Sequence, residues 1–491
     1  MNPISGFHIV RRRLKGIVSK PGMFRAITSK LFLEFAARNN CPKLAAWLVA
    51  WQVQTVCEAI VPGKPAVALT LPKSGFAEDI QYSIIRDGRF RVLRLHRKVL
   101  KMIANCFFEA LVDDNNYRQD DEAITARKAA YRNFMIAVCH HLVPRLELDV
   151  ALTANFSFYA EQEFAGALGH FDVPVVAVHK ECMKTPGVEP FYEKIYRERK
   201  MPFQGRKITT YNEIERRIEI NAGVAPAANI VATGAPRLDR FHKYRRDNAG
   251  QDQSLDGRPT VLFMSFNEKT GCPVLGRRGE HRYEELDPEF EKINWANLVR
   301  NCHRAMIRLA QEYPEIHVII KAKNHVLAMK ALTTGLGDEF VPPENLDVVV
   351  GGSSFELIVG CDVLCAINSG SLLEALAANV DVVSPYFDEA AAPLTAPFMV
   401  DLGDAADRAT STDDLVIMMA ERALAHPARN RESELRPASV GPLEQWVNNA
   451  DGKAGERVSQ VIMELVEEQR LKTLTLTAPL DTEISAISGT Q

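Results

Sequence analysis

The sequence predicts an α/β protein made of two Rossmann-like halves that face each other across a central cleft. Three observations predict this class. From about residue 145, short β-branched runs alternate with helical stretches, as in right-handed βαβ crossovers of parallel sheets. A polar, aperiodic stretch at 246–259 interrupts the alternation, which then restarts, so it is the expected linker. The 491 residues also exceed what one core usually supports.

The composition is that of an ordinary folded protein, with 46% hydrophobic and 25% charged residues. The formal net charge of −3 disfavours nucleic acid as a partner, because non-specific binding requires a broad basic surface. The nine cysteines are scattered and form no CxxC pair, which disfavours a disulfide framework or a structural zinc site. We therefore expect a cytoplasmic protein.

The N-terminal region, residues 1–145, is predicted to be mainly helical and to belong to the first half. It contains possible strands at Ala66–Leu71 and near Phe90–Leu95. The apolar stretch 44–61 contains two Gln and one Glu and is at the short end for a membrane span. A buried or interfacial helix is the better interpretation, with Trp47 and Trp51 on one face.

The chain begins with a basic segment, since seven Lys or Arg precede the first acidic residue, Glu34. Two interpretations remain open. Residues 1–30 contact an anionic membrane surface, where each cation contributes about 1 kcal/mol, or they form a solvated terminus. The first would make the protein peripheral at the inner membrane face.

The first Rossmann-like half spans 146–245. Its expected strands are Leu148–Asn155, Val173–Cys182, Lys207–Asn212 and Asn229–Gly234, and its helices are Tyr159–Gly169, 213–220 and one that begins near Arg237.

The second half spans 260–470, and its nearly all-apolar strands are typical of a sheet covered on both faces. Ser411 is expected to cap the helix 411–426, and the Thr- and Ser-rich tail 471–491 is expected to be disordered. The expected strands are Thr260–Phe266, Ile316–Ile320, Leu346–Val350, Asp362–Ile367 and Val380–Pro385, and the other helices are Trp295–Tyr313, one from Ser369 or Ser371, and 454–470.

The strongest chemical motif is the small polar turn between a buried strand and an amphipathic helix, Asn368-Ser369-Gly370-Ser371. Backbone N–H groups at a helix start, with two hydroxyls beside them, suit a phosphate. Glu374 could form a Ser371-x-x-Glu374 capping box or bind a ribose. The sequence has no GxGxxG after the first strand of either half and no P-loop, which disfavours a typical dinucleotide enzyme or P-loop NTPase.

Two further motifs follow strands. Lys321 and Lys323, with His325 beyond them, could neutralise a diphosphate at the carboxyl end of a strand, or form a solvated turn. His179 and Glu181 would point in one direction if their strand persists, so either is a candidate general base. A satisfied polar pair at a turn is the alternative.

A fourth motif, Thr233-Gly-Ala-Pro-Arg-Leu-Asp239, turns out of a strand. Gly234 and Pro236 favour a tight turn, and Asp239 would begin or cap the next helix. We interpret this motif as structural.

Six segments, taken in order along residues 145–400, resemble bacterial surface-carbohydrate and capsule biosynthesis glycosyltransferases with the GT-B fold, which are related to CDP-glycerol glycerophosphotransferases. These segments are VAVHKE, TGAPRLD, TVLFMSF, IIKAKNH, INSGSLLEAL and VDVVSPYF. The usual Lys-x-His-Pro reads Lys-Ala-Lys-Asn-His here. The N-terminal region and the segment 269–287 have no counterpart.

The resemblance implies a metal-independent GT-B glycosyltransferase of polysaccharide or lipopolysaccharide biosynthesis, with no cofactor and a nucleotide-activated sugar as substrate. The first half would bind a glycan or lipid-linked acceptor. His179 or Glu181 would be the base. Lys321, His325, Asn368, Ser369, Gly370, Ser371 and Glu374 would contact the donor. The alternatives are a CDP-polyol phosphotransferase, a UDP-sugar 2-epimerase, whose Asp-Ser-Gly-Gly loop is similar to residues 368–371, and a non-catalytic carbohydrate-binding protein.

Overall fold

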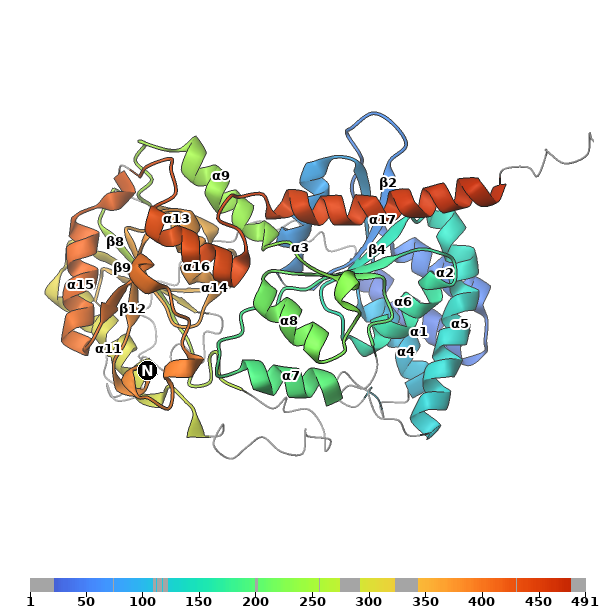
Figure 1. Ribbon diagram of the computed structural model, residues 1–491, viewed down its shortest axis with the longest axis horizontal. Helices are drawn as coiled ribbons and strands as arrows, with labels where there is room; N and C mark the ends of the chain where they lie inside the picture. The colour runs from blue at the N-terminus through green and yellow to red at the C-terminus, as the bar shows by residue number, and fades with distance from the viewer. Residues whose placement is uncertain are drawn as a thin grey trace, which may run out of the picture.

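The computed structural model consists of two halves, each built around a largely parallel sheet (Figure 1). It describes residues 22–73, 75–108, 112, 117, 122–198, 202–255, 257–273, 292–322, 343–429 and 431–477, without the side chains of 22–29, 429 and 473–477. Residues 1–21, the predicted ligand His325 and residues 478–491 lie outside these ranges. Within the described residues, the predicted α/β class with two Rossmann-like halves is confirmed.

The sheet of the first half takes three of its strands from the region before residue 145. Its described strands lie in the order β1-β3-β2-β4-β5-β6-β7, and β1 pairs antiparallel with β3 at the edge. Both strands predicted before residue 145 are present, and β2 pairs in parallel with β4. The bounds are β1 Gln54–Cys57, β2 Ala66–Leu71, β3 Phe90–Arg94, β4 Val150–Thr153, β5 Val175–Val178, β6 Lys207–Thr210 and β7 Ile230–Ala232.

Helices cover both faces of this sheet, as its fully buried strands require. Alternate residues of β2 point to opposite faces, so Val67 and Leu69 join one core and Ala66 and Ala68 another. The first core is closed by α1 Gly22–Arg38, α2 Pro42–Gln52, α4 Lys98–Phe108, α5 Glu122–Leu146 and α6 Tyr159–Gly169, and the second by α3 Phe76–Ile80, a π-helical turn Gln81–Ile85 and α17 Ala454–Thr477. Helices α7 Glu189–Glu198 and α8 Glu213–Asn221 pack over β5, β6 and β7.

The C-terminal helix α17 lies across the first sheet (Figure 1), although the sequence grouped it with the second half. Its residues Val458, Ile462 and Val466, four apart, are buried against that sheet and form one apolar stripe. The helix also continues to Thr477, so the expected start of the tail at 471 was wrong.

Asp239 anchors the start of α17 from a distant part of the chain. Its buried carboxylate accepts hydrogen bonds from the backbone N–H groups of Gly455 (2.9 Å) and Ala454 (3.2 Å) and from the Asn449 amide (2.8 Å). Burial raises the pKa of Asp239, although these hydrogen bonds act in the opposite direction. The motif was expected to begin or cap its own helix. Asp239 does begin α9 (Asp239–Asp247), but its side chain caps α17.

The sheet of the second half has the order β10-β9-β8-β11-β12-β13, with all pairs parallel. The five predicted strands are present, and the short polar strand β13 was missed. The bounds are β8 Thr260–Met264, β9 His317–Ala322, β10 Leu346–Val350, β11 Val363–Cys365, β12 Asp381–Pro385 and β13 Asp407–Ala409.

Helices α11 and α15 cover one face of this sheet, and α9, α13, α14 and α16 cover the other. Ser411 caps α15 as predicted, because its side chain accepts from the N–H of Asp414. The bounds are α11 Ala296–Glu312, α13 Phe355–Gly360, α14 Gly370–Ala377, α15 Thr412–Leu424 and α16 Pro437–Val447, with short 3₁₀ turns at Ala227–Asn229, Pro236–Leu238, Asp388–Ala391, Ala396–Phe398, Gly403–Ala405 and Pro427–Arg429.

Candidate functional site

The Asn368–Ser371 loop lies where ligands bind in open α/β sheets. In the second sheet the chain order reverses between β8 and β11, so the region beyond their carboxyl ends is a topological switch point. The loop leaves β11 there and leads into α14. The start of α14 therefore directs backbone N–H groups and the positive end of a helix dipole into this region.

The two serines of this loop are bonded to each other. Ser369 is the N-cap of α14 and accepts from the N–H of Ser371 at 3.3 Å, and the two hydroxyl oxygens are 2.7 Å apart. Because the cap is Ser369, Glu374 lies beyond the position that a capping box requires. The capping-box interpretation of Ser371 and Glu374 was therefore wrong.

Asn368 shapes the loop through its side chain. It has a positive φ of 46° and donates to the carbonyl of Phe398 (2.9 Å), while its amide oxygen accepts from the N–H of Val400 (2.8 Å). Its amide therefore ties the loop to the segment after the 3₁₀ turn at Ala396–Phe398, which positions the loop.

Glu374 faces cations at the junction of the halves. Burial raises the pKa of its carboxyl, although Arg237 and Arg240 act in the opposite direction. Arg237 is itself paired with Asp79, with 2.8 Å between Nη2 and Oδ2, and Arg240 lies 3.3 Å from Glu78.

Lys321 is the second-to-last residue of strand β9, near the carboxyl edge of the second sheet. Only 7% of the residue is exposed, and its ammonium donates to the carbonyl of Gly351. Burial lowers the pKa of this lysine. The cation is thus held close to the carboxyl ends of the strands, while its predicted neighbours Lys323 and His325 lie outside the described residues.

The switch point of the first sheet holds a cationic group that the sequence analysis missed. The reversal lies between β2 and β4, and β2 is followed by a turn with Lys73 and Gly75, which has a φ of 78°. A Cβ at Gly75 would lie 3.2 Å from Lys180 Nζ and 3.4 Å from Arg237 Nη1. The available signal was the Pro-Lys-Ser-Gly turn directly after an all-apolar strand.

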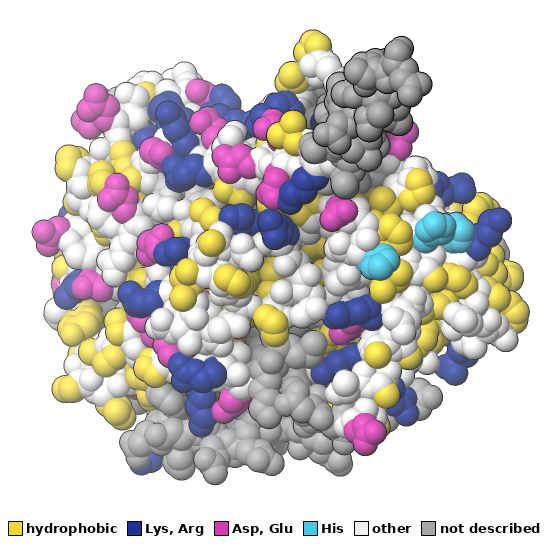
Figure 2. Space-filling model, turned by 45° about the vertical axis from the view of Figure 1, so that its right-hand side comes forward, with side chains coloured by type: hydrophobic (Ala, Val, Ile, Leu, Met, Phe, Trp, Pro, Cys, Tyr) yellow, Lys and Arg dark blue, Asp and Glu magenta, His cyan; other side chains and the backbone are white. Residues whose placement is uncertain are grey.

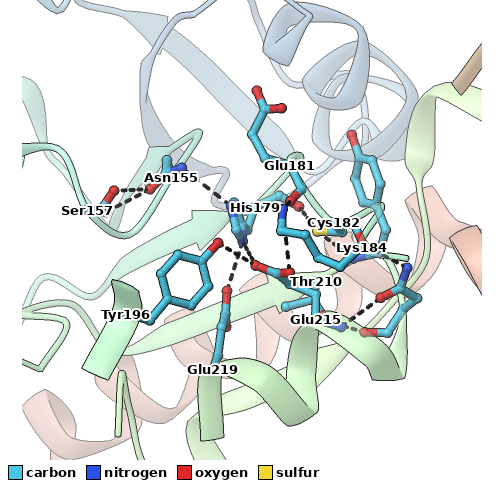
Figure 3. Close-up of polar contacts among 12 residues, drawn as sticks. Asn155, Ser157, His179, Glu181, Cys182, Lys184, Tyr196, Thr210, Glu215 and Glu219 are labelled. Carbon is cyan, nitrogen blue, oxygen red and sulfur yellow. Dashed lines mark hydrogen bonds and ion pairs between the residues drawn. The ribbon is translucent and has the colours of Figure 1, made fainter. Parts of the chain in front are cut away.

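The two predicted base candidates point in different directions (Figure 3). Strand β5 ends at Val178, so the alternation that would align them does not continue. His179 is fully buried, whereas the Glu181 side chain is 55% exposed beside Lys180 (3.5 Å) and Lys73 (3.8 Å). Although burial raises the pKa of Glu181, these cations and Lys184 lower it below its ordinary value. Glu181 is therefore an ionised carboxylate in a basic environment.

His179 belongs to a buried polar network under β5 (Figure 3). Its Nδ1 lies 2.8 Å from Glu219 and 3.3 Å from Glu215, and its Nε2 lies 3.4 Å from the Asn155 amide. The three side chains His179, Glu215 and Glu219 could place ligand atoms around a metal ion. However, Glu215 already has other partners. The Lys184 ammonium lies 3.8 Å from its carboxylate, and the Tyr196 hydroxyl donates to the same carboxylate at 2.9 Å. We interpret the group as a buried network of hydrogen bonds and ion pairs that supports the strand end.

The two motif-bearing segments meet at the junction of the halves. A Cβ at Gly370 would lie 3.9 Å from Met183 Sδ, four residues after His179. Further along, the N–H of Gly187 donates to the carbonyl of Pro397 at 2.8 Å. The structure therefore brings the 179–187 segment against the start of α14, as the cleft hypothesis requires.

Two surface hollows are present among the described residues. One is lined by residues including Tyr386, Met399 and Arg408 beside β12 and β13. The other lies between α6 and α17 and includes Arg206 and Glu468. Neither contains a residue that the sequence analysis assigned to a site.

Known structures resemble this chain at low identity. A UDP-GlcNAc 2-epimerase from Neisseria meningitidis, bound to UDP-GlcNAc, is 12% identical with a TM-score of 0.42 over 81% of this chain and 100% of that one. A putative UDP-N-acetylglucosamine 2-epimerase from Listeria monocytogenes is 11% identical, with a TM-score of 0.47 over 83% and 98%. A UDP-forming trehalose-phosphate synthase from Burkholderia xenovorans is 10% identical, with a TM-score of 0.44 over 83% and 100%.

These identities and TM-scores are too low for any of those activities to be transferred to this chain. No protein-family model and no curated protein matches the sequence. The resemblance to capsule and CDP-glycerol proteins therefore stays a prediction.

Proposed function

We propose that this protein is a nucleotide-sugar enzyme, a glycosyltransferase that moves a sugar from a nucleotide-activated donor to a glycan or lipid-linked acceptor. The observation that carries the proposal is the Ser369–Ser371 start of α14 at the switch point of the second sheet, facing Met183 of the first half. Such a helix start suits the phosphates of a nucleotide donor. Surface polysaccharide assembly is the setting that the sequence resemblance favours.

In this proposal the two halves have separate tasks. The N–H groups at the start of α14 and the ammonium of Lys321 stabilise the negative charge that develops on the departing nucleotide. Lys73, Lys180 and Arg237 supply positive charge from the opposite side. Glu181 is the better base candidate of the pair, because its carboxylate is accessible and ionised, whereas His179 is enclosed.

Calorimetric titration with UDP, CDP and CMP tests the donor site. We expect one nucleotide to bind and both Ser369→Ala and Lys321→Ala to weaken it by about tenfold or more. Nucleotide binding unchanged in both variants would contradict the site. The metal-independent version requires activity to survive EDTA, and rescue of a lost activity by Mn²⁺ would overturn it.

The rival activities are separated by their products. A UDP-sugar 2-epimerase would convert its substrate without an acceptor, which NMR of the sugar ring protons detects. A CDP-polyol phosphotransferase would release CMP instead of a nucleoside diphosphate. A non-catalytic carbohydrate-binding protein would bind without turnover in either assay.

A further inference from the structure

Exposed hydrophobic residues are concentrated on the two N-terminal helices. Among the described residues, 15 large hydrophobic side chains are exposed, and nine of them lie between Leu31 and Val61. We define the α1–α2 face as the six on the helices themselves: Leu31, Phe32, Phe35, Leu44, Trp47 and Trp51. Scattered exposed hydrophobics are normal in folded proteins, but four exposed aromatic rings on two helices that pack against each other indicate an interaction site.

The face includes a preformed aromatic element. Trp47 and Trp51 are one turn apart on α2, are 49% and 41% exposed, and stack with ring centroids 6.4 Å apart and planes 2° apart. On the other side of α2, Leu48 and Val49 are buried in the first core. Helix α2 is therefore apolar on nearly all sides, although the part of the chain that the structure describes buries only one of them.

Exposed cations lie on and beside the two helices of this face. Lys30, Arg38 and Lys43 are exposed on or beside the two helices, and Lys30 lies 3.7 Å from Glu34, which is the one acidic residue among residues 30–52. Figure 2 turns this end of the molecule forward and shows hydrophobic side chains beside Lys and Arg along its right-hand edge. Aromatic and basic residues together are typical of surfaces that insert into the interface of an anionic membrane.

We propose that the α1–α2 face docks on an anionic lipid bilayer, with its aromatic rings at the headgroup level and the cations against lipid phosphates. Among the described residues, no helix is both long and apolar enough to cross a membrane, so the proposed contact lies in the interface plane. Covering the face by a second copy, or by residues 1–21, would bring cations against cations. The proposal does not depend on glycosyl transfer, because the face is remote from α14 (Figure 1).

The tryptophans make the test direct. The full chain is titrated with phosphatidylcholine vesicles that contain or lack phosphatidylglycerol, and binding is followed by sedimentation and intrinsic fluorescence. The other two tryptophans, Trp295 and Trp446, are at most 1% exposed, so a blue shift reports Trp47 and Trp51. We expect binding to the anionic vesicles alone, with a blue shift, and weaker binding at higher salt.

Two variants and one control decide the outcome. Trp47→Ser with Trp51→Ser, and separately Lys30→Glu with Lys43→Glu, should each reduce binding by about tenfold or more. Ile417→Ser with Leu424→Ser removes similarly exposed hydrophobics from α15 and should change nothing. Nucleotide binding should be the same in all of them.

Three results would overturn the proposal. One is no binding to anionic vesicles, and another is equal binding by the tryptophan variant. The third is lipid-free self-association of the parent chain that the tryptophan variant abolishes, because this would assign the face to a second copy.

Discussion

Gly370, at the first position of α14, lies against Met183 of the opposite half. A Cβ built on Gly370 would lie 3.9 Å from the Met183 sulfur. The phosphate-loop candidate and the segment that carries Glu181 thus form one junction between the halves. A ligand bound at the start of α14 would be within reach of both sheets.

The cap serine of α14 should matter for ligand binding beyond its effect on the helix. Ser369→Ala removes an N-cap, which costs about 1 kcal/mol of unfolding free energy, and should also lower nucleotide affinity about tenfold. Ser411→Ala removes the equivalent cap of α15 and is the matched control. Its stability loss should be similar, with nucleotide affinity unchanged in calorimetry. Equal affinity losses in both variants would mean that the effect is only structural.

Glu181 should affect turnover more than binding. Glu181→Gln keeps the shape and removes the charge, so kcat should fall by 10²-fold or more, as about that factor is typical of a lost general base, while nucleotide affinity stays the same. Because the pKa of Glu181 is lowered, the acidic limb of the pH–rate profile that it causes should lie below its ordinary value of 4.5. Glu213→Gln, at an exposed position of α8, should leave kcat unchanged. An unaltered kcat in Glu181→Gln would remove this residue from the mechanism.

Glu374 should make the protein less stable as pH rises. Its pKa is raised in the folded state, so the folded protein favours the protonated form. The stability from this group is present below its unfolded-state pKa and is lost as pH rises through the folded-state pKa. Glu374→Gln should therefore raise the Tm at pH 7. Below the unfolded-state pKa of Glu374 the carboxyl is protonated in both states, so there the variant should have nearly the same Tm as the parent chain. A Tm at pH 7 that falls in the variant would show that attraction to Arg237 outweighs burial.

Substitution of Asp239 should lower the free energy of unfolding more than substitution of Ser369, Glu181 or Glu374. Asp239→Ala leaves the N–H groups of Gly455 and Ala454 and the Asn449 amide without their buried acceptor, at a cost of about 2–4 kcal/mol. Asp247→Ala on the same helix removes an exposed partner of Lys243 and should cost less than about 0.5 kcal/mol. Urea unfolding of the two variants checks this. Similar midpoints would contradict the anchoring role.

Most of the two sheets could be predicted because buried parallel strands have continuous apolar sequences. The strand β10 was predicted with its observed ends, and so was the helix α6. The strand β13 was missed, since Asp-Arg-Ala is three residues long and largely polar. The location of α17 could not be predicted because its partners, such as the carboxylate of Asp239, are more than 200 residues away in the chain.

The candidate site was predicted in part. The serine loop could be recognised from a local strand–turn–helix pattern, which needs no knowledge of tertiary contacts. The different directions of the His179 and Glu181 side chains could not be predicted. They depend on the residue at which β5 ends and on the α8 carboxylates that contact the imidazole of His179. The convergence of Lys180 and Arg237 at Gly75 depends on strand order, which the sequence does not specify.

The return of the chain into α17 determines how the halves can move. The polypeptide crosses between them twice, after β7 and again before α17. The two crossing segments are hydrogen-bonded to each other, since the Ala235 N–H donates to the Val447 carbonyl at 3.0 Å. Two adjacent tethers permit rotation about the line that joins them and oppose swivelling or separation. A protease cut within 248–255 falls after α9, which packs on the second sheet, so the fragments of the nicked protein should still elute together, held by both α9 and α17.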